Sequence, residues 1–246
     1  MQTLRLIGDS LPGSIGDIKD TVEQSAVVPT PFVGDWVEIG EPMEYVGANT
    51  MQAINASVDL TKVFSNGDPI RLKQGAGFLY FYVIGVTATV LDIQAGTDYV
   101  LANATITDFA RGNKGNPTGF PFVFDFDADP RAPGAGTLSG LLNESYRFWM
   151  NGAQATVVIS FDTADLSATD SAIVADLPIG PDNSGGDFQI LGFLATNNFT
   201  PQSGMAKLET TSSYDVAFQI VLDTGFGTWA ISMNGTGVDA TLIYLT

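Results

Sequence analysis

The feature that most constrains the fold is a succession of short β-rich segments separated by turn signals. Val, Ile, Thr and aromatic residues alternate with polar ones in these segments, and Asn66-Gly67-Asp68 and Ala95-Gly96 read as turns between them. In the first half of the chain we expect strands at 36–39, 44–46, 52–54, 69–73, 79–86, 89–93 and 97–100. This spacing of short strands and turns predicts a small antiparallel β-barrel or sandwich.

The second half of the chain has a similar spacing of β-rich segments and turns, although its sequence is not a repeat of the first half. The expected strands are 146–150, 155–161, 172–177, 188–194, 205–210, 216–222, 228–233 and 241–245. Their number and spacing predict a C-terminal, jelly-roll-like β-sandwich. No helical pattern is long enough for a βαβ crossover, which excludes a doubly wound fold. The predicted class is therefore all-β.

Two segments rich in Gly, Pro and charge mark the boundary between the halves: RGNKGNPTG at 111–119 and DADPRAPGAG at 127–136. They flank an apolar, strand-like run at 120–126. We predict an N-terminal arm over 1–34, a small β domain over 35–115, a linker with a strand over 116–136 and the sandwich over 137–246. Ile18 and Val22 have the spacing of a short helix within 15–28.

The charge is strongly acidic, with 27 acids, 10 bases and a formal net charge of −17. After Phe161 the only base is Lys207. Such a surface repels nucleic acid and anionic membranes, so neither is an expected partner. No apolar run approaches the roughly 18 residues of a membrane span, and the N-terminus does not resemble a signal peptide. These features predict a soluble protein made in a cytoplasm.

The chain has no Cys and no His, which excludes disulfides, zinc sites built on those residues, thiol nucleophiles and histidine-dependent triads. Gly8-Asp9-Ser10-Leu11 resembles the nucleophile block of the GDSL hydrolases, but that family needs a histidine base. We therefore expect no enzyme, no catalytic residue and no cofactor. A hydrolase with two converging carboxylates is the open alternative, because the sequence selects no pair among the 27 acids.

Two sets of residues are candidate binding sites. Asp125, Asp127 and Asp129 alternate with apolar residues, so on a strand their carboxylates project from one face about 7 Å apart. They are a candidate Ca²⁺ site, although a solvated strand face explains the same pattern. Trp149 and Trp229 are candidate glycan-stacking residues, against the alternative that they are core. Two further aromatic candidates for that glycan face are Tyr146 and Phe226.

Residues 66–107 resemble a module recurrent in virion proteins of tailed bacteriophages. The resemblance lies in NGDPIRLKQGAGFLYFYVIGV followed by TATVLDIQAGTDYVLANATIT, and it continues through Gly119-Phe120-Pro121. The second half is similar in style to the β domains that follow this module, from YRFWMNG at 146–152 through Leu177-Pro178 to the terminal strand at 240–245.

The resemblance implies a homotrimer, with one domain seated on the capsid or tail and the other facing solvent. The expected function is that of a capsid-decoration or head-fibre protein located in the virion, with the major capsid protein or other virion proteins as partners. The N-terminal arm is expected to add a strand to a neighbour. The alternative is a tail or fibre adsorption module whose sandwich binds a host-surface glycan.

Overall fold

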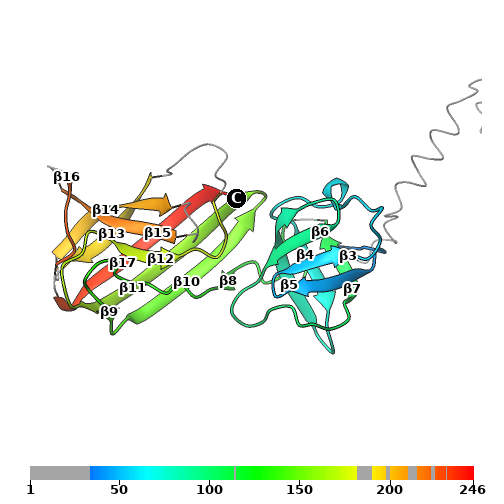
Figure 1. Ribbon diagram of the computed structural model, residues 1–246, viewed down its shortest axis with the longest axis horizontal. Helices are drawn as coiled ribbons and strands as arrows, with labels where there is room; N and C mark the ends of the chain where they lie inside the picture. The colour runs from blue at the N-terminus through cyan, green and yellow to red at the C-terminus, as the bar shows by residue number, and fades with distance from the viewer. Residues whose placement is uncertain are drawn as a thin grey trace, which may run out of the picture.

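The computed structural model describes residues 34–113, 115–181, 190–197, 200–209, 215–222, 225–230 and 232–246. They form two antiparallel β-sheets and one 3-10 turn, η1 (Leu60–Lys62), as Figure 1 shows. The predicted all-β class, a small β unit followed by a β-sandwich, is confirmed. The predicted arm, apart from Gly34, lies outside the described residues, together with its helix at 15–28 and Gly8-Asp9-Ser10-Leu11.

The first sheet has seven strands in the order β1-β7-β4-β5-β6-β3-β2. Their bounds are β1 (Trp36–Glu38), β2 (Met43–Gly47), β3 (Thr50–Ala53), β4 (Pro69–Lys73), β5 (Phe78–Val86), β6 (Val90–Gln94) and β7 (Thr107–Gly112). Alternation decides which side chains enter the core: in β4, Ile70 and Leu72 are fully buried. Arg71 and Lys73 point the other way, where they pair with Glu38 and Asp108.

Two predictions in this half are wrong. The strand β7 was not predicted, because Asp108, Arg111 and Gly112 give this segment the composition of a loop. In the structure β7 lies between β1 and β4. Residues 97–100 were expected to form a strand and instead form a loop. The Tyr99 hydroxyl holds this loop against β5, since it donates to the carbonyl of Tyr80 (2.8 Å) and accepts from its N–H (3.0 Å).

The second sheet has ten strands along the path β12-β15-β14-β13-β17-β11-β10-β8, with β16 paired to β15 and β9 to β11. Their bounds are β8 (Phe124–Asp125), β9 (Leu138–Ser139), β10 (Leu142–Asn151), β11 (Gln154–Leu166), β12 (Ile173–Asp176), β13 (Ile190–Asn197), β14 (Thr200–Glu209), β15 (Asp215–Leu222), β16 (Gly225–Phe226) and β17 (Ser232–Leu245).

Residues 124–131, here called the closing segment, connect the two ends of this curled sheet. At one end β8 pairs with β10, and the N–H of Phe126 donates to the carbonyl of Tyr146 (3.1 Å). At the other end Arg131 exchanges two backbone hydrogen bonds with Val174 in β12, each 2.8 Å long. The segment predicted as a linker therefore belongs in large part to the second unit, and most of the predicted strand at 120–126 is irregular chain.

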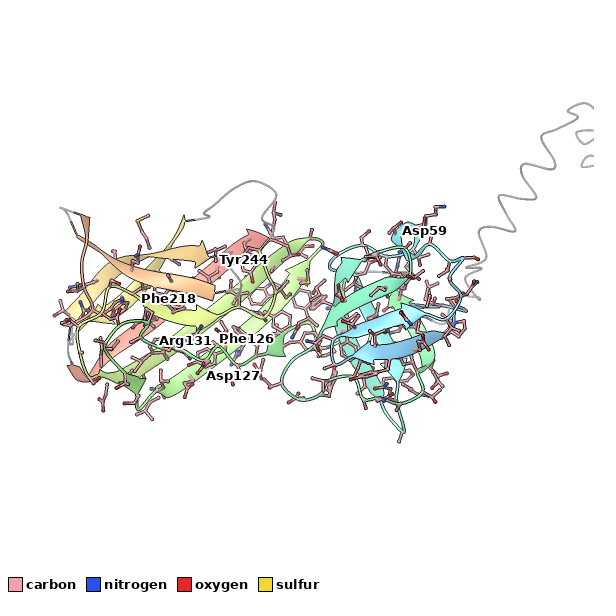
Figure 2. All side chains as sticks on the ribbon, viewed as in Figure 1. Asp59, Phe126, Asp127, Arg131, Phe218 and Tyr244 are labelled. Atoms are coloured by element: carbon pink, nitrogen blue, oxygen red, sulfur yellow. The ribbon has the colours of Figure 1, made fainter. Side chains whose placement is uncertain are left out.

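The inner face of the second sheet forms an aromatic core. Phe193 packs edge-on against Phe218 at 5.0 Å between ring centroids and stacks on Trp229 at 6.4 Å. The hydroxyl of Tyr244 donates to the carbonyl of Ile179 (2.8 Å), which links β17 to the chain beyond β12. Figure 2 places Phe218 and Tyr244 within this unit. The predicted strand at 228–233 is wrong in its first part, because Trp229 forms an isolated bridge with Asp170 and β17 begins at Ser232.

Aromatic rings fill the junction between the two units. Tyr82 of β5 lies 4.9 Å from Phe120 and 6.4 Å from Phe148 of β10, centroid to centroid. Its hydroxyl donates to the carbonyl of Phe122 (2.9 Å). The N–H of Thr97 donates to the carbonyl of Asp125 (3.0 Å). Burial raises the pKa of Tyr82 to about 12, because the phenolate loses its hydration there.

A backbone contact between two glycines forms a second part of the junction. A Cβ atom added to Gly67 would lie 1.9 Å from the carbonyl oxygen of Gly152 in the β10–β11 turn. Beside it, the Asn66 side-chain amide donates to the backbone carbonyl of Thr246 (3.4 Å). Only glycine at position 67 allows the two turns to approach this closely. The two units are thus joined by side-chain packing and by direct backbone contact.

Candidate interaction surface

The outer face of β10, β11 and β17 carries several exposed apolar side chains. Alternation sends Phe148, Val157 and Leu242 inward, where each is fully buried. The residues beside them therefore project outward. In register on this outer face are Trp149 of β10, Thr156 of β11 and Ile243 of β17.

We call this set, together with two exposed neighbours, the apolar row: Val123, Trp149, Thr156, Ile243 and Leu245. Leu245 lies two residues along β17 from Ile243, opposite Gln154. Ile243 is 45% exposed and Leu245 is 53% exposed. Trp149 is half-buried, and Thr156 is 9% exposed because larger side chains flank it. Val123, 44% exposed, directly precedes β8, whose Phe124 pairs with Phe148. Exposed apolar groups that gather on one sheet face indicate an interaction surface.

The next row along the strands separates the apolar row from the rest of the face. It contains Arg147, Val158 and Thr241 in register. Arg147 forms an ion pair with Asp125 of β8 at 3.6 Å. Arg147 and Asp125, on this outer face, therefore pair with each other.

Further along the same face lies an open groove of about 520 Å³. Its lining includes Ser160, Asp162, Leu194, Gln202, Ser203 and Asp239. Leu194 is 68% exposed, and Asp162 accepts a hydrogen bond from the Asn143 side-chain amide (2.8 Å). The groove thus presents carboxylates, hydroxyls and one large apolar side chain.

The prediction that Trp229 stacks on a glycan is wrong. Trp229 is fully buried, and its indole N–H donates to the carbonyl of Phe218 (3.0 Å). A side chain enclosed on all sides offers no face to a ligand, so the core alternative holds for Trp229. Trp149 does lie on the outer face, in the apolar row, and stays a candidate contact residue.

The other two aromatic candidates are placed differently. Tyr146 points to the inner side, packs against Phe126 at 6.1 Å and donates its hydroxyl to Glu144 (2.8 Å). Burial, together with the Glu144 carboxylate, raises the pKa of Tyr146 above its ordinary value. Phe226 lies in β16, and its side chain is outside the described set.

The three aspartates of the candidate Ca²⁺ site lie on the closing segment, where Figure 2 labels Phe126, Asp127 and Arg131. All three are exposed and alternate with buried Phe126 and Ala128. Asp125 pairs with Arg147, Asp129 lies 3.8 Å from Arg131, and Asp127 accepts from the N–H of Asp129 (3.2 Å). Within the described part of the chain no group of three acidic side chains is placed to hold a metal ion. The three carboxylates do not converge, so the geometry favours the solvated strand face.

Sequence reasoning missed Ile243 and Leu245 as surface residues. A signal for them was present: in Thr241–Leu245 the apolar character does not alternate, so both faces of the strand carry apolar side chains. A strand with one solvated face ordinarily reads as alternating, and this departure indicates that the outer face is apolar as well.

Comparison with protein-family models, with curated proteins and with solved structures gives no match for the chain. Among the described residues, no helix has the length and apolar character required to cross a membrane.

Proposed function

We propose that the chain is a non-catalytic structural subunit of a bacteriophage virion, a capsid-decoration or head-fibre protein that stabilises the particle by oligomeric packing. The observation that carries this proposal is the junction. Tyr82, Phe120 and Phe148 pack across it, and Gly67 meets Gly152 backbone to backbone. Two units that pack against each other in this way keep a fixed relation, which suits a subunit that holds neighbours in a shell at a fixed spacing.

The surface also supports this role. A formal net charge of −17 favours docking on a basic partner, while the apolar row offers an uncharged area for packing. On this proposal the chain is made in the host cytoplasm, forms a homotrimer and binds the major capsid protein or another virion protein. The resemblance of residues 66–107 to tailed-phage virion modules supports the same assignment.

The test is immunogold labelling of intact phage particles from the host that carries the gene, with antibodies raised against the purified chain. Label on the heads supports the decoration role. Label confined to the tail tip or fibres moves the protein to the tail and favours adsorption. Particles without label on any part overturn the virion assignment.

The groove favours a second candidate function, adsorption to a host-surface glycan. Asp162 and Asp239 supply acceptors for sugar hydroxyls, and Leu194 supplies an apolar wall. On a glycan array, binding lost in Asp239→Asn and Leu194→Glu but kept in Val46→Glu, an exposed site on β2, supports this function. An array without binding sets it aside. Sugar released from a polysaccharide panel identifies a two-carboxylate hydrolase instead.

A further inference from the structure

We propose that Asn151 is a site of spontaneous covalent modification, at which the side-chain amide is lost through a succinimide ring formed with the backbone nitrogen of Gly152. The inference goes beyond the proposed function and does not depend on it. It rests on a comparison of the three Asn-Gly steps in the chain, which are Asn66-Gly67, Asn151-Gly152 and Asn234-Gly235.

The reaction needs only the two residues and solvent water. The backbone nitrogen of Gly152 attacks the side-chain carbonyl carbon of Asn151, a C–N bond forms, and the amide nitrogen leaves as ammonia with the proton that the backbone nitrogen loses. Water then opens the ring at one of its two carbonyl carbons. One opening gives aspartate, and the other gives isoaspartate, whose main chain runs through the former side chain. Glycine favours the attack because it has no Cβ to obstruct its nitrogen.

The Asn151-Gly152 step lies in the β10–β11 turn. Asn151 ends β10 and pairs with Gln154 at the start of β11, which leaves Gly152 and Ala153 as a two-residue loop. Gly152 has φ +58, as the first central residue of a type II′ hairpin turn requires. All four residues are exposed. The reacting groups and water therefore meet at the surface of the protein.

Hydrogen bonds do not restrain the reacting groups at this turn. Within the described residues, no turn or loop hydrogen bond engages the Gly152 N–H, and the Asn151 side chain has no hydrogen-bond partner. The nearest bonds run from the N–H and the hydroxyl of Thr246 to the carbonyl of Ala153 (2.8 and 3.1 Å). They hold the next residue of the turn and leave the attacking nitrogen available.

The fold blocks the same reaction at Asn66-Gly67. Gly67 is buried, and its N–H donates to the carbonyl of Val83 (2.7 Å). The Asn66 side-chain amide donates to the carbonyl of Thr246 (3.4 Å). The Gly67 nitrogen can attack only after this turn opens locally, and an opening free energy of about 1.4 kcal/mol slows the reaction about tenfold.

The third Asn-Gly step lies inside a strand. Asn234 and Gly235 belong to β17, and Gly235 is buried. Ladder pairs with β11 hold Ser232 and Thr236 on the two sides of this step, so its backbone is restrained as well. The side chain of Asn234 is outside the described set. Among three steps of identical sequence, the structure therefore selects Asn151 as the reactive one.

The modification changes the junction between the two units. The carbonyl oxygen of Gly152 is the atom that lies against Gly67. Isoaspartate at position 151 lengthens the main chain by one carbon directly before Gly152, and both products add a negative charge to the turn. A longer main chain does not fit the two-residue turn, so the contact with Gly67 should loosen. The isoaspartate form should therefore unfold at a lower urea concentration than the fresh chain.

The experiment is peptide mapping by tandem mass spectrometry of the folded full chain, incubated at mildly alkaline pH in water enriched in the heavy oxygen isotope. The label should enter residue 151 as a mixture of aspartate and isoaspartate, at least about ten times faster than residue 66 or 234. In urea, where the fold gives no protection, the three steps should react at similar rates. The matched control is Asn151→Gln, whose longer side chain would have to close a six-membered ring and should keep its amide.

Two outcomes overturn the inference: equal labelling of the three steps in the folded chain, and an amide at Asn151 that stays intact in the folded chain while urea exposes it to reaction. Conversion to aspartate without isoaspartate overturns the succinimide route, because ring opening gives both products. An isoaspartate fraction with the same urea midpoint as the fresh chain overturns the effect on the junction.

Discussion

Replacing Gly67 with alanine tests whether the two units are held by backbone contact. Gly67 has φ +85, and an added Cβ would lie 1.9 Å from the Gly152 carbonyl oxygen. Real Cβ contacts essentially never fall below 3.0 Å, so the two turns must separate by at least 1.1 Å (3.0 − 1.9). The three atoms nearest to the added Cβ are the carbonyl oxygen, carbonyl carbon and Cα of Gly152, all of the backbone, so no side chain can move aside to relieve the clash.

The expected loss of unfolding free energy has two parts. A non-glycine residue in the left-handed region costs about 1–2 kcal/mol. Forcing packed groups apart costs about 1–3 kcal/mol more. Gly67→Ala should therefore lose about 2–5 kcal/mol in total.

Gly75 provides the matched control for this measurement. It has nearly the same conformation, φ +84, but nothing lies within 4 Å of its added Cβ. Gly75→Ala should lose only the conformational part, about 1–2 kcal/mol. Urea denaturation followed by circular dichroism gives both values, and small-angle scattering should show a longer particle for Gly67→Ala alone. Equal losses in the two variants, with equal scattering, would refute the reasoning about the junction.

Three further predictions concern single side chains. Trp229→Ala should lose about 3–5 kcal/mol in urea denaturation and Trp149→Ala only about 1 kcal/mol, because the first ring is fully buried and the second is half-exposed; similar losses would contradict the assignment of the two faces. The pKa of Tyr82 is raised from 10.0 to about 12 in the folded chain, so its contribution to the unfolding free energy should be constant below pH 10 and should fall as the pH rises to about 12. If Tyr82→Phe unfolds at the same alkaline pH as the wild-type chain, this reasoning is contradicted. Asp170, 5% exposed, accepts hydrogen bonds from the N–H groups of Gly134 and Ser171 at 2.7 Å each. Asp170→Ala should therefore lose about 1–3 kcal/mol of unfolding free energy for each donor left unpaired, and calorimetry should show a smaller loss for Asp170→Asn.

The sequence allowed most strands to be predicted because their alternation is local. Pro69–Lys73 was predicted with its observed bounds, and the pattern of β4 is the clearest in the chain. β7 could not be found in this way, since Ala110 and Gly112 are small and their burial between β1 and β4 depends on distant strands. The loop at 97–100 was mistaken for a strand because the bonds from Tyr99 to Tyr80 are likewise tertiary.

The candidate surface was only partly predictable. The sequence around Trp149 and Trp229 does not show which of the two side chains is buried. The register of β10 places Trp149 on the outer face, whereas Trp229 packs beside Phe193 and donates to Phe218 in the core. Asp125, Asp127 and Asp129 are exposed and alternate with buried residues, although only Asp125 lies in a strand. Whether three carboxylates converge depends on backbone curvature and on the positions of Arg131 and Arg147, which no local pattern contains.

The position of β17 between β13 and β11 has a consequence for the order of events during translation. The first sheet is complete once residue 112 has left the ribosome, whereas the central strand of the second begins only at residue 232. At about 5–20 residues per second, the intervening 120 residues (232 − 112) take roughly 6–24 s to synthesise. From the time each is synthesised until β17 follows, β11 and β13 lack the neighbour that joins them, and their unpaired edges are open to other nascent chains. A folded first unit already tethers these strands, so a ribosome-stalled chain ending before residue 232 should yield a protease-resistant fragment that contains the first sheet alone.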